Sequence, residues 1–182
     1  MKKIASIDIG SNTVRLLILE TDGNQKFQTL ASRRVITRLG EGMDTYGKLM
    51  ESRMSETFSA LSRFQKECVE HGNPPLFAVA TSAVREASNG QEFIRQALKK
   101  TGIKIEIISW EEEARLTLEG VFWKIPHDNR RILTFDIGGG STEFILSEGK
   151  NIAGFCSSSL GVVRLTEKFI SQHPIDDTEY KN

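Results

Sequence analysis

The stretch DIGGGSTEF, at residues 136–144, places an aspartate, three glycines and Ser-Thr-Glu within nine positions. An apolar run leads into it from residue 130, and another follows to residue 148. Consecutive glycines weaken a pair of strands unless something needs the space that side chains would fill. The pattern therefore predicts two strands joined by a tight glycine turn, with Asp136 beside that turn.

A looser copy of this phrase, DIGSNTVRL, occupies residues 8–16. In both copies an aspartate ends an apolar run, and the following turn can point several backbone N–H groups into one space, where an anion binds. The aspartate would repel a phosphate unless a divalent cation lay between them, and Mg²⁺ binds through one or two carboxylates together with phosphate oxygens. Each copy therefore indicates a metal–phosphate site, with an ordinary hairpin beside an acid as the alternative.

The two copies are not chemically equal. Arg15 stands in the first copy where Glu143 stands in the second, and Ser11 and Asn12 replace two of the glycines. We therefore expect the second copy to form the tighter metal–phosphate turn and the first to form a supporting wall across a cleft.

The patterning around the first copy predicts a complete α/β domain. Three strands joined by short turns form an antiparallel meander, with a hairpin turn at TDGN, residues 21–24. Helices with apolar residues at steps of three and four then alternate with short buried strands. The order β-β-β-α-β-α-β-α is that of a ribonuclease-H-like domain. The expected strands are 3–9, 14–20, 26–36, 76–80 and 103–109; the expected helices run from Met50 to His71, over 90–101 and over 110–124, with a loop at 38–47 and a loop or short helix at 81–90.

The same order restarts around the second copy. Strands are expected at 130–137, 142–148 and 151–159, and a helix at 161–172. We therefore predict a ribonuclease-H-like domain at 1–125 and the opening, incomplete half of a second one at 126–182. A truncated chain and a short natural gene both fit this interpretation.

Composition restricts the classes of partner. The 182 residues carry 24 basic and 24 acidic side chains, which argues against a general nucleic-acid binder but not against a local site for a small anion. The N-terminus MKKIASIDIG has an acid inside its short apolar run and is no signal peptide, and no apolar run is long enough to span a membrane. Cys68 and Cys156 lie in no metal-binding spacing. A cytoplasmic protein is expected.

The acidic stretch SWEEEARL, at residues 109–116, opens a predicted helix. Ser109 and Glu112 form a capping box, and acids in a first helical turn offset the helix dipole. Glu113 precedes Ala114 and is therefore expected nearer the packed side of the helix. A partly buried carboxylate beside a phosphate turn can act as a general base on water, and a purely structural role for the three acids is the alternative.

Seven motifs in this order resemble the exopolyphosphatase/guanosine pentaphosphate phosphohydrolase (Ppx/GppA) family, and they cover nearly the whole chain. The resemblance implies two ribonuclease-H-like domains of the actin-like ATPase superfamily with the active site between them. It also implies Mg²⁺-dependent release of the terminal orthophosphate of inorganic polyphosphate or of pppGpp. The motifs are IDIGSNTVRLLI, RLGEG, TSAVREASN, EEEARL, LEGV, DIGGGSTEF and SLGVVRLTE.

The resemblance also assigns roles to residues. Glu113, directly before the alanine of the EEAR motif, would be the catalytic base, and Asp136 and Glu143 would bind the metal. Arg85 would neutralise phosphate charge, as a bidentate guanidinium can, with an exposed salt-bridging arginine as the alternative. The turn residues Gly138, Gly139, Gly140 and Ser141 would cradle phosphate oxygens, and the first copy would contribute Asp8, Ser11 and Asn12.

One departure and several alternatives stay open. Trp110 stands where the family usually has a glycine, so substrate fit near the helix start is in question. The alternatives to a phosphohydrolase are an actin-like ATPase or sugar kinase, which would lack the EEAR glutamate, and a non-catalytic phosphate- or nucleotide-binding module. The preference between polyphosphate and pppGpp and the formation of a homodimer are left open, and no nucleic-acid or membrane partner is expected.

Overall fold

The computed structural model describes residues 1–23, 26–123, 125 and 130–170. The chain divides into two compact units, Met1–Ile107 and Ile108–Asn182. In the described residues, no helix is both long and apolar enough to cross a membrane. The predicted hairpin turn at TDGN lies partly outside the described residues.

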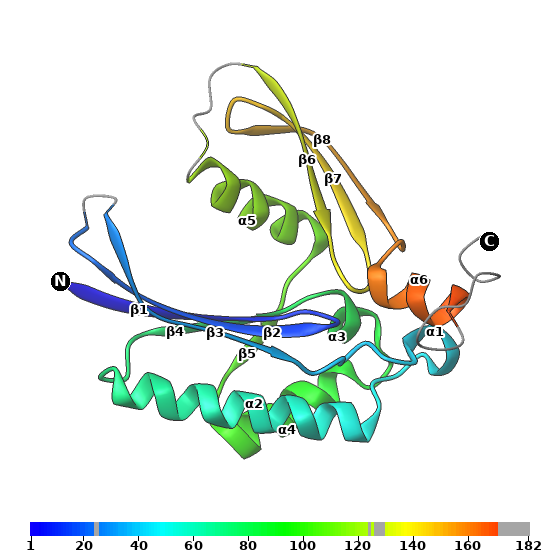
Figure 1. Ribbon diagram of the computed structural model, residues 1–182, viewed down its shortest axis with the longest axis horizontal. Coiled ribbons are helices and arrows are strands. Elements are labelled where there is room, and N and C mark those ends of the chain that lie inside the picture. Colours follow the sequence, from blue (N-terminus) through cyan, green and yellow to red (C-terminus); the bar gives the residue numbers. More distant parts are fainter. Residues whose placement is uncertain (24–25, 124, 126–129, 171–182) are drawn as a thin grey trace. The chain divides into compact units, whose positions relative to one another are not determined.

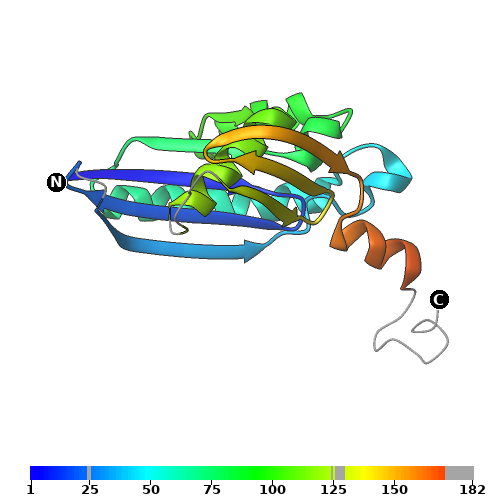
Figure 2. The ribbon, with the colours of Figure 1, turned by 90° about the horizontal axis from the view of Figure 1, so that it is seen from above.

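The first unit is built on a five-stranded sheet with the order β3-β2-β1-β4-β5, which can be followed in Figure 2. The first three strands are antiparallel, whereas β4 runs parallel to β1 and β5 parallel to β4. This mixed topology confirms the ribonuclease-H-like prediction, although β5 is shorter than expected. The strands are β1 Lys2–Ile9, β2 Thr13–Thr21, β3 Phe27–Ile36, β4 Leu76–Ala80 and β5 Ile105–Ile107.

Two long helices cover one face of this sheet (Figure 1). Apolar residues of α2 at helical spacing, such as Met54, Phe58 and Leu61, are buried against the sheet residues Ile7 and Ile9. The expected helices are confirmed within a residue or two, and the loop at 38–47 contains a short helix that the patterning did not predict. The helices are α1 Met43–Tyr46, α2 Glu51–Glu70, α3 Ser82–Glu86 and α4 Gly90–Thr101.

The second unit contains an antiparallel sheet with the order β6-β7-β8 and two helices. Ala114 and Leu118 of α5 pack against Ile145 of β7, so α5 covers one face of this sheet. The sequence-based division placed this helix in the first domain, whereas its buried face groups it with the second unit. The elements are α5 Trp110–Phe122, β6 Arg131–Ile137, β7 Thr142–Glu148, β8 Asn151–Ser158 and α6 Val162–Phe169.

The two copies of the glycine phrase form hairpins with the same register. In the first, Asp8 lies opposite Arg15; in the second, Asp136 lies opposite Glu143. The turns also close alike, since the Gly10 N–H donates to the Thr13 carbonyl at 3.0 Å and the Gly138 N–H donates to that of Ser141 at 2.8 Å. The sequence repeat is therefore a structural repeat.

The repeat shows that the second sheet has an open apolar face. Ala5, Ile7 and Ile9 are buried under α2 and α4. Their counterparts on β6, which are Leu133, Phe135 and Ile137, are 52%, 56% and 66% exposed. We call these three residues the β6 apolar row. The row occupies the face that two helices cover in the first unit.

We expect the β6 apolar row to bind a hydrophobic dye. Anilinonaphthalene sulfonate binds exposed hydrophobic surface, and the β6 apolar row is such a surface, so the native chain should enhance the fluorescence of the dye. The double variant F135S/I137T should lower that signal severalfold without changing the far-ultraviolet circular dichroism. Dye fluorescence equal to that of the native chain would show that other residues bind the dye.

Candidate active site

The glycine turn of the second unit is braced by the helix that follows β8. The backbone N–H groups of Val162 and Val163 donate to the carbonyls of Gly138 and Gly139 at 3.0 and 2.9 Å. The Thr142 hydroxyl also donates to the Leu160 carbonyl. The first N–H groups of α6 are therefore occupied by the turn, which explains why SLGVVRLTE accompanies DIGGGSTEF in the sequence.

Gly161 is the point of closest approach between α6 and the turn. A Cβ atom on this residue would lie 2.2 Å from the Gly139 carbonyl oxygen and 2.4 Å from the Gly140 carbonyl carbon. Both are backbone atoms, so no side-chain rotation relieves the overlap. The position requires glycine for space rather than for an unusual φ, which is −122°, and motif reasoning alone did not identify it.

Asp136 and Glu143 lie side by side on the sheet face that α5 covers. They are direct cross-strand partners, and such pairs have Cβ atoms about 4.5–5.5 Å apart. Asp136 accepts a hydrogen bond from the Thr117 hydroxyl of α5, 3.2 Å from its Oδ2. Glu143 is 2% exposed and accepts one from the Ser157 hydroxyl of β8, 3.0 Å from its Oε1.

The three consecutive acids of α5 have different environments. Ser109 caps the helix as predicted, accepting a hydrogen bond from the Glu112 N–H at 3.2 Å. The Glu112 carboxylate pairs with Arg115 at 2.7 Å, and this hydrogen bond lowers the pKa of Glu112. Glu111 is exposed. Glu112 and Glu113 are both half-buried, but Glu112 pairs with the exposed Arg115, whereas Glu113 lies next to the buried Ala114. Glu113 is therefore the acid of this stretch that combines partial burial with a place on the packed side of the helix.

Glu113 also lies one helical turn before Thr117, the residue that contacts Asp136. Positions i and i+4 share one face of a helix. The same face carries Ala114 and Leu118, which pack on Ile145, so Glu113 and Asp136 belong to one helix–sheet interface. The second unit thus brings together six predicted residues besides Glu113: Asp136, Gly138, Gly139, Gly140, Ser141 and Glu143.

The other predicted residues form a separate group in the first unit. The Ser11 hydroxyl is hydrogen-bonded to that of Ser82 at 2.8 Å, which ties the first turn to α3, the helix that carries Arg85. Both serines are buried, Arg85 is half-buried, and Asp8 is exposed on the sheet face away from α2 and α4. Sequence reasoning missed Ser82 because it gave no role to the serine of TSAVREASN.

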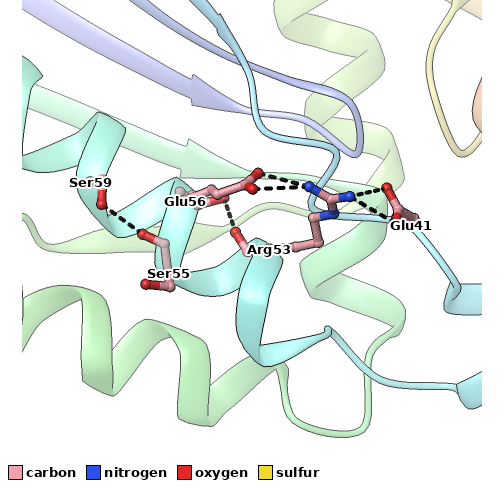
Figure 3. Close-up of polar contacts among 6 residues, drawn as sticks. Glu41, Arg53, Ser55, Glu56 and Ser59 are labelled. Atoms are coloured by element: carbon pink, nitrogen blue, oxygen red, sulfur yellow. Dashed lines mark hydrogen bonds and ion pairs between the residues drawn. The ribbon is translucent and has the colours of Figure 1, made fainter.

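The RLGEG motif supports the first turn from the other side. The N–H groups of Thr37 and Arg38 both donate to the Asn12 carbonyl at 3.1 Å, and that of Gly40 donates to the Ser11 carbonyl at 2.7 Å. Arg53 of α2 then holds the motif's glutamate, with its Nη2 2.8 Å from Glu41 Oε2 (Figure 3). The hydrogen bond to Glu41 is the main cause of the raised pKa of Arg53. The Asn12 contact is through its main chain.

The pair Asp136–Glu143 has the composition of a magnesium site that is completed by substrate. No group of three or more His, Cys, Asp or Glu residues suited to a metal occurs in the described part of the chain. Mg²⁺ needs only one or two carboxylates when phosphate oxygens and waters fill its other positions. Two adjacent carboxylates beside a glycine turn therefore fit a metal that binds together with a phosphate.

Curated relatives cover nearly all of this chain. It is 35% identical over 187 aligned positions to the bifunctional 3-dehydroquinate synthase/phosphatase of Fusobacterium nucleatum, covering 98% of this chain and 28% of that protein. It is 32% identical to exopolyphosphatase 1 of Mycobacterium tuberculosis, covering 94% of this chain and 50% of that one. The chain thus spans half or less of the length of these two relatives.

Solved structures agree with this relationship. An exopolyphosphatase from Cytophaga hutchinsonii has a TM-score of 0.89 and 34% identity, over 98% of this chain and 57% of that one. Two solved structures that are only 15% and 16% identical, of ethanolamine utilization protein EutJ from Carboxydothermus hydrogenoformans and of MreB5 from Spiroplasma citri, share the fold alone. Residues 17–182 match the Ppx/GppA phosphatase family. The chain belongs to the Ppx/GppA phosphatase family.

Proposed function

We propose that this chain carries the catalytic site of an Mg²⁺-dependent phosphohydrolase that releases terminal orthophosphate from inorganic polyphosphate, from pppGpp, or from both. The observation that carries the proposal is the pair Asp136–Glu143, held in register beside the glycine turn on the face covered by the helix of Glu113. Related proteins named exopolyphosphatases are similar over almost the whole chain.

The residues divide the chemistry of phosphoryl transfer among them. This chemistry depends on positioning and charge neutralisation more than on covalent catalysis. The Glu113 carboxylate accepts a proton from the attacking water. The N–H groups of Gly139, Gly140 and Ser141 bind phosphate oxygens, whereas the Gly138 N–H closes the turn on the Ser141 carbonyl.

Further positive charge on the phosphate would come from the metal and from Arg85. Mg²⁺, held by Asp136 and Glu143, would supply positive charge to the phosphate oxygens of the scissile anhydride. Arg85 would add a bidentate guanidinium. Asp8, Ser11 and Asn12 stay predicted residues of the phosphate site, and we place the activity in the cytoplasm.

Phosphate release with matched variants tests this function. We expect the chain to release orthophosphate from polyphosphate or pppGpp with Mg²⁺ and to stop when the metal is chelated. D136N should lower the rate at least about tenfold, because loss of a residue that merely orients a metal ligand already costs about 10–100-fold and Asp136 is a proposed ligand itself. E148Q, an exposed acid at the end of the same hairpin, should not change the rate.

Each alternative has its own outcome in this assay. Binding of tripolyphosphate without phosphate release would favour a non-catalytic binding module. Turnover of ATP alone would favour an actin-like ATPase or kinase. Equal rates for D136N and the native chain would contradict the metal site at Asp136.

A further inference from the structure

We propose that Thr117 and Ser157 are positioning residues that fix the two carboxylates of the proposed metal site. Each hydroxyl donates one hydrogen bond to one carboxylate: Thr117 to Asp136 and Ser157 to Glu143. The inference rests on the proposed function, because it assigns these hydroxyls to the same Mg²⁺–phosphate site. No motif in the sequence had singled out either residue.

The direction of the Thr117 hydroxyl is unusual for a threonine in a helix. Such hydroxyls commonly bond the carbonyl one turn back in their own helix. Thr57 and Thr101 of this protein do so, at 2.8 Å from the Arg53 carbonyl and 2.7 Å from the Ala97 carbonyl. The Thr117 hydroxyl instead crosses from α5 to the sheet and reaches Asp136 at 3.2 Å. It therefore links the helix of the proposed base to the strand of a proposed metal ligand.

Ser157 flanks Glu143 on the strand opposite to that of Asp136. It lies directly opposite Glu143 in the β7–β8 ladder, as Asp136 does in the β6–β7 ladder. The three side chains form one row across the three strands, and the Ser157 hydroxyl is 3.0 Å from Glu143 Oε1. Since a row across a sheet is rigid, this bond restricts the side-chain rotation of Glu143.

The two hydroxyls leave most of the carboxylate capacity for other partners. An ionised carboxylate has two oxygens that accept about four hydrogen bonds or metal bonds, and each hydroxyl uses one of these positions. A charged carboxylate that is 2% exposed is costly unless a cation or several donors compensate it. A hydroxyl that orients such a carboxylate without neutralising it suits a site whose positive charge arrives with the metal.

Loss of either hydroxyl should weaken metal binding. Partners that orient a metal-binding side chain typically contribute 10–100-fold to metal affinity. We therefore expect T117V, which keeps the shape of threonine and removes its hydroxyl, to weaken metal binding by about tenfold or more. S157A should have a similar effect. T117S restores a hydroxyl at the same position and should recover most of the affinity.

Mn²⁺ replaces Mg²⁺ as the probe, and its binding to the full chain with tripolyphosphate is followed by electron paramagnetic resonance. This measurement does not depend on turnover. The controls are T101V, which removes a hydroxyl bonded within its own helix, and S158A, the next residue on β8. Thermal unfolding of every variant confirms that it is folded.

The outcomes separate the positioning role from the site itself. Weaker Mn²⁺ binding for T117V and S157A, recovery for T117S and no change for the controls support the proposal. Native affinity in T117V and S157A, with weak binding in D136N and E143Q, overturns it and leaves the metal site standing. Native affinity in D136N and E143Q, or no Mn²⁺ binding by the native chain, contradicts the metal site and the positioning role together.

Discussion

E113Q is expected to lower the rate of phosphate release by about 10²–10⁴-fold, the usual contribution of a general base. Glutamine keeps the size of the side chain and its place on α5 but cannot accept a proton from water. Because the carboxylates of Asp136 and Glu143 are untouched, binding of Mn²⁺ with tripolyphosphate should stay within about threefold of the native value, as expected when only transition-state interactions are lost.

The neighbouring acid supplies a matched control for this variant. Glu111 lies two residues earlier on α5 and is exposed, so E111Q removes the same charge from the same first helical turn without altering the packed face. We expect E111Q to keep the native rate. A similar loss of rate in both variants would show that the charge of the helix start matters rather than a base at Glu113.

G161A is expected to have the largest structural effect. The added methyl group would overlap the backbone of Gly139 and Gly140 at 2.2–2.5 Å, so either α6 or the glycine turn must move. Overpacking of this kind costs about 1–3 kcal/mol. We expect a lower melting temperature and weaker binding of Mn²⁺ with tripolyphosphate, because the hydrogen bonds from Val162 and Val163 to the turn would be displaced.

A glycine-to-alanine substitution at Gly120, in the same unit, should raise the stability of the protein instead of lowering it. Gly120 is exposed on α5, and a Cβ atom there would meet no heavy atom within 4 Å. G120A should therefore stabilise the helix by up to about 1 kcal/mol, since alanine has the higher helix propensity. Unchanged melting and unchanged ligand binding in G161A would mean that the turn tolerates a shift of α6.

The hairpins of the proposed site could be predicted because their information is local. The turns at Gly10 and Gly138 each close within four residues. Because side chains alternate between the two faces of the short strands on either side, the register that pairs Asp136 with Glu143 follows from the sequence. The same locality made α2 and α4 predictable, since the apolar spacing lies within each helix and a glycine, Gly72 or Gly102, follows its last turn.

The remaining features depend on contacts between distant segments. The spacing of Ala114 and Leu118 shows that α5 has an apolar face, but not that this face meets Ile145. The partner of the Thr117 hydroxyl follows from that packing and was therefore not predictable. The short β5 reflects how far the edge of the sheet pairs with β4, which the apolar run at 103–109 does not specify.

The two hairpins have the same backbone register but differ in the charge of the side-chain pair that faces across it. Both hairpins keep one cross-strand geometry, yet the facing pair carries formal charges of −1 and +1 at Asp8–Arg15 and −1 and −1 at Asp136–Glu143. One residue at this position therefore decides whether two facing side chains cancel each other's charge or together attract a cation. The same backbone register gives a neutral pair in the first hairpin and a pair of formal charge −2 in the second.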